Sequence, residues 1–316
     1  MIAVACLLLQ IAVPDSGTAS LVASLRGGRA DPVAFVLAAL RRHRVVMLGD
    51  IHPAAEPKRI VQEVIAAHVR EGALSAVALE VGRDQQGVID RYLASDPEDT
   101  TILLDHPVTL RVVWGASREY LGIYRSAWRH NHGPGRAAPI ALVAADVPGW
   151  PIPALSVGMA LQAFANRDLG LAANLAQALE RLGPDAHLLV LFGGYHGLKR
   201  VTARVSGRGA GLTLDGWAGG LLAARGVDVY TILSDGASGG GELSTGATQL
   251  FPLAERAGLR APFAVALDST VDVVPEPLMP IVQEGMSLEF VPRRFSLREA
   301  VDGYLFLGRF QRTTPL

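Results

Sequence analysis

Ionisable side chains stand at the ends of several apolar runs in this chain, and their types suit chemistry at a polar site. Each of four short apolar runs is followed within four residues by one or two such residues. The candidates are Asp50 with His52, then Glu80, Asp146 and His196. Imidazoles and carboxylates together suit general acid–base catalysis. They also suit a divalent metal bound by nitrogen and oxygen ligands.

Glycines accompany both candidate histidines. The pattern Gly-x-x-His occurs as Gly49-Asp-Ile-His52 and again as Gly193-Gly-Tyr-His196, each time at the end of an apolar run. Small residues at a strand end let the backbone turn sharply and let a substrate approach closely. The repeated pattern therefore favours a site over two unrelated turns, although a histidine bonded to backbone in a turn is the structural alternative for each.

Four further roles are weighed in the same way. Asp146 either contacts substrate or caps the following segment. Tyr195 either supplies a hydroxyl to substrate or packs in the core. Arg167 and Asp168 lie inside a helical stretch, where a surface ion pair is the alternative to a role in the site. Glu80 follows four apolar residues, and a buried carboxylate needs a partner, which favours function there.

The elements that must position these residues are expected strands and helices, which alternate along the chain. The apolar runs lack period-two alternation, as in strands that are covered on both faces. Stretches whose apolar residues have helical spacing lie between these runs. This alternation predicts a mostly parallel sheet with helices on both faces and a cleft at the strand carboxyl ends. Expected strands are 45–48, 76–79, 139–145, 187–192, 227–233, 263–267 and 304–307, and expected helices are 31–44, 55–70, 85–93, 117–130, 159–182 and 216–224. The glycine-rich stretches 205–211 and 235–241 are expected to be loops.

The composition of the chain excludes several classes of protein. The chain has 316 residues, 50% of them hydrophobic, and a formal net charge of -1, so a large core is expected and a nucleic-acid partner is not. Cys6 is the one cysteine, which rules out an intrachain disulfide framework. Residues 1–20 resemble a signal peptide, which favours export to the periplasm or the exterior, and 21–316 are expected to form a single α/β domain with no transmembrane span.

Several motifs resemble a known superfamily. It groups erythromycin esterases, ChaN-type haem-binding lipoproteins and TIKI/TraB metalloproteases. The motifs are Gly49-Asp-Ile-His52, Leu79-Glu80-Val, Gln85-Gln86, Asp90-Arg-Tyr-Leu93, Asn166-Arg167-Asp168 with Ala172-Ala173-Asn174, Gly193-Gly-Tyr-His196, Gly216-Trp-Ala-Gly-Gly-Leu-Leu, Gly226-Val-Asp-Val-Tyr-Thr-Ile232 and Asp302-Gly-Tyr-Leu-Phe306. The resemblance covers roughly residues 40 to 310 and implies an α/β sheet surrounded by helices.

The resemblance also implies roles for single residues. His52 would be a general base or a metal ligand, and Glu80 its acidic partner or a second ligand. His196 would be the second essential histidine, and Arg167 would contact substrate or an acidic site residue. The family usually has glutamate where this chain has Asp50, so a carboxylate that orients His52 would sit differently here.

A hydrolase is the leading interpretation, with a small molecule or a peptide as substrate. In a metal-free form, Asp50 or Glu80 orients His52, which deprotonates a water that attacks an ester or amide carbonyl, and His196 or Arg167 stabilises the oxyanion. In a metal form, His52, Glu80 and His196 hold a divalent ion. The alternatives are a haem- or iron-ligand-binding protein of ChaN type and a degenerate family member. The chain offers no Gly-x-Ser-x-Gly elbow, which disfavours a serine hydrolase.

Overall fold

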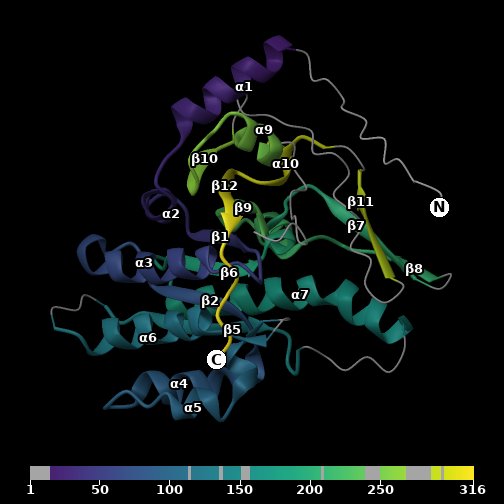
Figure 1. Cartoon of the computed structure of the whole chain (residues 1–316). Coiled ribbons are helices and arrows are strands. Elements are labelled where there is room, and N and C mark those ends of the chain that lie inside the picture. Colours follow the sequence, from purple (N-terminus) through teal and green to yellow (C-terminus); the bar gives the residue numbers. More distant parts are fainter. Residues whose placement is uncertain are drawn as a thin grey trace, which may run out of the picture.

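A seven-stranded sheet forms the centre of the molecule (Figure 1). The computed structural model describes residues 15–112, 115–134, 138–150, 157–207, 210–238, 250–267, 286–292 and 295–316. The strands of this sheet, in spatial order, are β10 (Phe263–Ala266), β12 (Gly303–Phe310), β9 (Val229–Ser238), β1 (Val45–Asp50), β6 (Leu188–Gly193), β2 (Ala76–Gly82) and β5 (Ala141–Asp146).

Five neighbouring pairs of this sheet are parallel, and β10 alone pairs in the antiparallel direction, with β12. Every residue of β1 and β2 is buried, as expected for strands covered on both faces. Because β1, β2, β5 and β6 run the same way, their carboxyl ends meet at one edge of the sheet. The predicted fold class, a mostly parallel α/β sheet with helices on both faces, is confirmed.

Helices cover both faces of the sheet. The longer ones are α1 (Asp15–Gly28), α2 (Pro32–Leu40), α3 (Glu56–Glu71), α4 (Gln86–Ala94), α6 (Arg118–His132) and α7 (Val157–Leu182). The shorter ones are α5 (Thr101–Leu104), α8 (Ala218–Ala224), α9 (Leu250–Arg256), α10 (Leu297–Ala300) and the 3-10 turns η1 (Arg83–Gln85), η2 (Pro107–Leu110) and η3 (Gly194–Gly197).

Two buried apolar clusters hold these layers together. One joins α2, α3, α4 and α6 to one face of the sheet, and the other joins α7 and α8 to the opposite face. Leu175 of α7 and Ile65 of α3 are both fully buried. Full burial of one such side chain contributes roughly 1.5–3 kcal/mol, so the two faces are each fixed by many such contributions.

Capping residues mark where several helices begin and end. Asp31 accepts a hydrogen bond from the Ala34 N–H and caps α2, with Pro32 in the first turn. Ser117 caps α6 by accepting a bond from the Tyr120 N–H. Gly72 follows α3 with a φ of 62°, the left-handed conformation that glycine adopts at least cost.

Amide side chains cover the β5 edge of the sheet. Gln86 donates to the Leu142 carbonyl and accepts from the Ala144 N–H, so it takes the place of a neighbouring strand. Asn131 does the same with both backbone groups of Ile140. These bonds satisfy polar backbone that would otherwise offer a pairing edge.

A second, three-stranded antiparallel sheet lies beside the main one. Its strands are β11 (Met286–Val291), β7 (Thr202–Gly207) and β8 (Ala210–Thr213), and a short pair, β3 (Arg111–Val112) and β4 (Gly115–Ala116), completes the strands described. The expectation of a loop at 205–211 was therefore wrong. Ala203 and Val205 are buried while Arg204 is exposed, and this alternation outweighs the glycines that suggested a loop.

The expected loop 235–241 was also wrong over its first part, because β9 continues through Ser238. Gly236 and Gly308 lie opposite each other in the β9–β12 pairing. A Cβ at position 236 would lie 3.0 Å from the Gly308 carbonyl oxygen, so glycine here serves close strand approach. Residues 239–241 lie outside the described part of the chain.

At the N-terminal end, α1 begins within residues 1–20, the stretch that resembles a signal peptide, and Leu25 of this helix is fully buried. Residues 1–14 lie outside the described residues, and export stays a prediction. Within the described chain, no helix has the length and apolar character needed to cross a bilayer.

Candidate active site

The carboxylate of Glu80 lies at the centre of the polar cluster at the sheet edge. It is 4% exposed, and its two oxygens accept hydrogen bonds from the Arg167 guanidinium and from the Gly193 N–H, the latter at 2.7 Å. The His52 Nε2 atom lies 4.0 Å from one of these oxygens, and the His196 Nε2 atom lies 3.9 Å from the other. Both imidazoles therefore turn their Nε2 atoms toward one buried anion.

Asp50 bonds the other ring nitrogen of His52, Nδ1. Its Oδ2 atom lies 3.1 Å from His52 Nδ1, and its Oδ1 atom accepts a bond of 2.5 Å from Lys58 Nζ. Lys58 is 1% exposed and also donates to the backbone carbonyls of Ile51, His52 and Ala54. The lysine thus fixes the whole turn from β1 to α3 and neutralises the buried Asp50.

Asp168 holds the second imidazole in the same manner. Its Oδ1 atom lies 2.8 Å from His196 Nδ1 and also accepts the Ala218 N–H at 2.8 Å. An imidazole that donates from Nδ1 to a carboxylate presents an unprotonated Nε2 atom as an acceptor. The arrangement is two aspartate–histidine pairs that face one glutamate.

Arg167 links this glutamate to Asp146. Its Nη2 atom donates to Asp146 at 2.5 Å and its Nε atom at 3.1 Å, while Nη1 lies 3.2 Å from His196 Nε2. The guanidinium carbon lies 4.0 Å from the centre of the Trp150 ring, which covers it. Arg167 therefore has a partner at each of its three nitrogens and an aromatic ring against its guanidinium face.

The backbone places these groups in a predictable way. Arg167 and Asp168 are successive residues of α7, so they leave the helix about 100° apart and reach different partners. Asn174, two turns further on, donates to the carbonyls of Ala145 and Asp146 and so anchors the β5 end to α7. The motif with Asn174 thus belongs to the support of the site.

Glycine at position 193 lies against both imidazoles. A Cβ there would lie 3.2 Å from His52 Nε2 and 3.5 Å from His196 Cδ2. The missing side chain leaves the room in which both imidazoles face Glu80.

Charges within the cluster shift its pKa values in different directions. Burial opposes ionisation of Glu80, but the charges of Arg167 and the two histidines outweigh it and lower the pKa of this carboxyl. Burial likewise opposes ionisation of Asp50, and Lys58 outweighs it and lowers that pKa as well.

The pKa of Asp146 moves the other way, because burial and the charge of Glu80 raise it in spite of Arg167. Burial disfavours a charged His196, but Asp168 outweighs this effect and raises its pKa. Protonation of His196 at Nε2 would remove the hydrogen bond that Arg167 donates to it. The charge state of His196 is therefore tied to the position of Arg167.

The structure brings together most of the residues expected in the site, which are Asp50, His52, Glu80, Asp146, Arg167, Asp168 and His196. Arg167 and Asp168 are 4% and 1% exposed, so they are not the surface ion pair of the alternative interpretation. Asp146 also accepts the Val147 N–H at 2.7 Å, as expected of a cap, and its contact with substrate stays a prediction.

Tyr195 lies apart from these groups. Its ring packs against Trp217 and Phe290, with ring centroids 6.2 and 5.3 Å away. Burial and the charge of Asp235 raise the pKa of its hydroxyl to about 12. The packing contacts favour the core role for Tyr195, and a substrate contact stays a prediction.

Sequence reasoning missed Lys58 and Trp150. Lys58 is one of two lysines in the chain and follows the His52 motif by six residues, which is the signal that could have drawn attention to it. Trp150 closely follows Asp146, but nothing in its spacing predicts a contact with Arg167.

A divalent metal fits these residues poorly. The Arg167 guanidinium bonds Glu80 and lies against His196, so a cation held by His52, Glu80 and His196 would meet a fixed positive charge. Among the described residues, no trio of histidine, cysteine and acidic side chains has an arrangement that could hold an ion. The donor set therefore favours chemistry carried by the side chains themselves.

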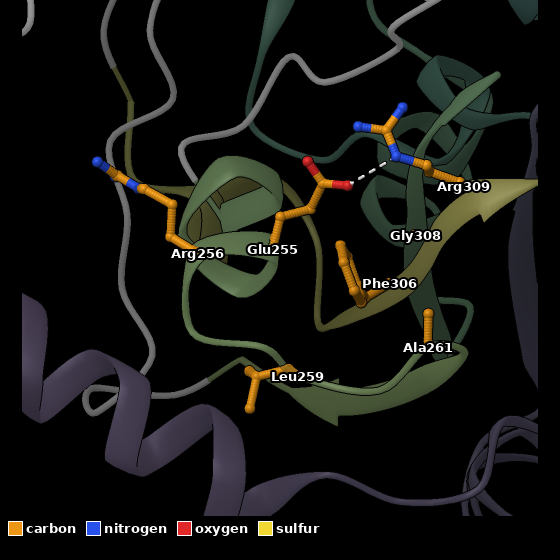
Figure 2. Close-up of a pocket in the computed structure, with 7 residues that line it drawn as sticks. All are labelled: Glu255, Arg256, Leu259, Ala261, Phe306, Gly308 and Arg309. Carbon is orange, nitrogen blue, oxygen red and sulfur yellow. Dashed lines mark ion pairs between the residues drawn. The ribbon is translucent and has the colours of Figure 1, made fainter. Parts of the chain in front are cut away.

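A separate pocket of about 530 Å³ lies between α9 and the end of β12 (Figure 2). Phe306, Leu259 and Ala261 form its apolar part, and an ion pair between Glu255 and Arg309 lies at its side. It shares no residue with the histidine and carboxylate cluster.

Comparison with solved structures supports the fold. A Bacillus cereus protein superposes with a TM-score of 0.65 at 12% identity, over 94% of this chain and 98% of that one. A mutant of the erythromycin esterase EreC in its open conformation gives 0.58 at 14% identity, over 89% and 94%. A succinoglycan biosynthesis protein gives 0.61 at 11% identity, over 96% and 100%.

The expected resemblance to erythromycin esterases is thus confirmed at the level of the fold. The haem-binding ChaN of Campylobacter jejuni aligns with a TM-score of 0.39 over 64% of this chain, too low to carry an argument. No family model matches the chain, and none of the curated proteins matches it in sequence.

Proposed function

We propose that this protein is a hydrolase that uses His52 as a general base to direct water at an ester carbonyl, without a metal ion. The observation that supports this most is the bond between His52 Nδ1 and Asp50, which leaves Nε2 facing the cluster. The His52 side chain is 19% exposed, so water and a substrate can reach it. Aspartate, although one methylene shorter than the family's glutamate, still reaches His52 at 3.1 Å.

Each residue of the cluster then has a task. Asp50 fixes the tautomer of His52 and stabilises the imidazolium that forms when Nε2 takes a proton from water. Arg167 stabilises the developing oxyanion with an N–H group, and Glu80 and Asp146 hold its guanidinium in place. The His52 imidazolium then returns this proton to the leaving alkoxide, and His196, which Asp168 orients through Nδ1, keeps its unprotonated Nε2 atom toward Arg167.

Haem binding gains no support from the cluster. A haem site needs an axial ligand and a wide apolar pocket. Both site histidines are bonded to aspartates and face a carboxylate, which makes their surroundings charged.

The test is a panel of chromogenic esters assayed in the presence of EDTA. We expect turnover of at least one ester by the wild-type protein, lost in His52→Gln and in His196→Gln. His43→Gln is the matched control, because His43 lies near the opposite end of β1 and bonds Asp228 at the surface. An inactive wild type across the panel, or turnover that survives both site substitutions, would contradict the proposal.

A further inference from the structure

A basic pocket of about 300 Å³ lies along α6, beside α3, and shares no residue with the candidate active site. Its walls include the side chains of three arginines, Arg118, Arg125 and Arg129, together with Gln62 of α3. The arginines stand seven and four residues apart on α6, and this spacing places them on one face of the helix. The volume is that of a small-molecule site.

Gly122 makes the hollow between the two helices. A Cβ at this position would lie 2.6 Å from the Gln62 Nε2 atom, which donates to the Glu119 carbonyl at 2.8 Å. The amide is therefore held at the wall of the pocket, and the space above the glycine stays open to a ligand.

The fold leaves the positive charge of this pocket largely uncompensated. Arg125 pairs with Glu98 at 3.0 Å. The guanidinium groups of Arg118 and Arg129 make no hydrogen bond or ion pair within the described residues, and Arg129 feels Glu98 only at longer range. Arg118 is also the first residue of α6, where the helix dipole disfavours a cation.

This local excess stands out because the chain as a whole carries a formal charge of -1. Three cations on one helix face repel one another, and at Arg118 and Arg129 no ion pair within the described residues offsets that cost. A bound anion would offset it. Guanidinium groups match phosphate oxygens in bidentate geometry, which favours a phosphate over a single carboxylate.

We propose that this pocket binds a phosphorylated small molecule, whose phosphate oxygens accept hydrogen bonds from Arg118, Arg125 and Arg129. Gln62 and Ser126 offer neutral polar contacts to the rest of the ligand, and Leu121, Gly122 and Leu316 complete the lining. The site is independent of the hydrolase chemistry.

The test is isothermal titration calorimetry with pyrophosphate at constant ionic strength. We expect saturable one-to-one binding to the wild type, and a loss of at least about tenfold in affinity in Arg118→Gln/Arg129→Gln, since each charged hydrogen bond contributes about that factor. The matched control is Arg181→Gln/Arg225→Gln, which removes the same charge from two exposed positions and should bind like the wild type.

Two results would overturn the proposal. One is a wild-type titration without saturable binding. The other is equal affinity in the two double variants, which would show that pyrophosphate responds to net charge alone. Circular dichroism of each variant shows whether it is folded, and all four substituted arginines are exposed, so loss of the fold is not expected.

Discussion

Replacing Lys58 by methionine should destabilise the protein far more than replacing its other lysine. The Lys58 ammonium is 1% exposed and pairs with Asp50 at 2.5 Å, and it donates to three backbone carbonyls of the turn that follows β1. Lys58→Met keeps the volume of the side chain but leaves Asp50 as an unpaired buried charge.

The magnitude follows from this geometry. Removing one partner of a buried ion pair costs about 3–5 kcal/mol, because the remaining charge loses its compensation without regaining water. Lys199 provides the contrast, because it also pairs with a carboxylate, Asp302 at 2.5 Å, but at 18% and 31% exposure. Exposed pairs contribute about 0–1 kcal/mol, so we expect Lys199→Met to cost no more than about 1 kcal/mol from its ion pair.

The assay is urea unfolding followed by circular dichroism, with a double-mutant cycle. Asp50→Asn in the Lys58→Met background should recover part of the lost free energy of unfolding, since it removes the unpaired charge. A cost of less than about 1.5 kcal/mol for Lys58→Met would refute the reasoning, because it is half the smallest loss expected. Equal costs at the two lysines, or strict additivity in the cycle, would refute it as well.

Three further predictions concern the site and the core. Gly193→Ala should abolish ester turnover because its Cβ would lie 3.2 Å from His52 Nε2, whereas Gly87→Ala, with open space around it in α4, should leave turnover unchanged and raise the free energy of unfolding by about 0.5–1 kcal/mol; equal turnover in both variants would contradict this. Burial and the neighbouring His130 lower the pKa of His68 below its ordinary value of 6.5, so the unfolded chain binds a proton first and stability should fall as pH drops below about 6.5. Between pH 7.5 and 5, the free energy of unfolding in urea should depend less on pH in His68→Asn than in wild type or in the exposed control His106→Asn. Asparagine is chosen because its side-chain oxygen can still accept the Leu74 N–H. The same pH dependence in all three proteins would contradict this prediction. Mass spectrometry of protein purified without a histidine tag should find less than stoichiometric divalent metal, and EDTA should leave turnover intact; a stoichiometric ion lost together with activity would overturn the metal-free account.

The position of residues just after the expected strands was enough to predict the centre of the site from sequence alone. Residues that follow buried parallel strands meet at one edge of the sheet, and this geometry needs no knowledge of the loops. Asp50, His52, Glu80, Asp146 and His196 were found in this way. Asp168 and Arg167 needed the resemblance as well, since a helical position alone favours the surface.

The contacts that the sequence could not predict depend on loop conformation. Lys58 reaches Asp50 because the turn after β1 folds back over it, and Trp150 covers Arg167 from a loop. Tyr195 and His196 are neighbours in η3, yet successive side chains of a tight turn point in different directions, so only one of them reaches Glu80. The strands β7 and β8 were missed because Gly207 and Gly211 suggest a loop.

The central claim is that Asp50 makes His52 a general base, and kcat/KM of Asp50→Asn on the best ester of the panel tests it most directly. Asparagine keeps the shape of the side chain but removes the charge that stabilises the His52 imidazolium, so we expect a loss of about 10²–10⁴-fold in the folded variant. Circular dichroism gives the folded fraction, by which the rate is corrected. A folded Asp50→Asn protein with the kcat/KM of the wild type would contradict the account.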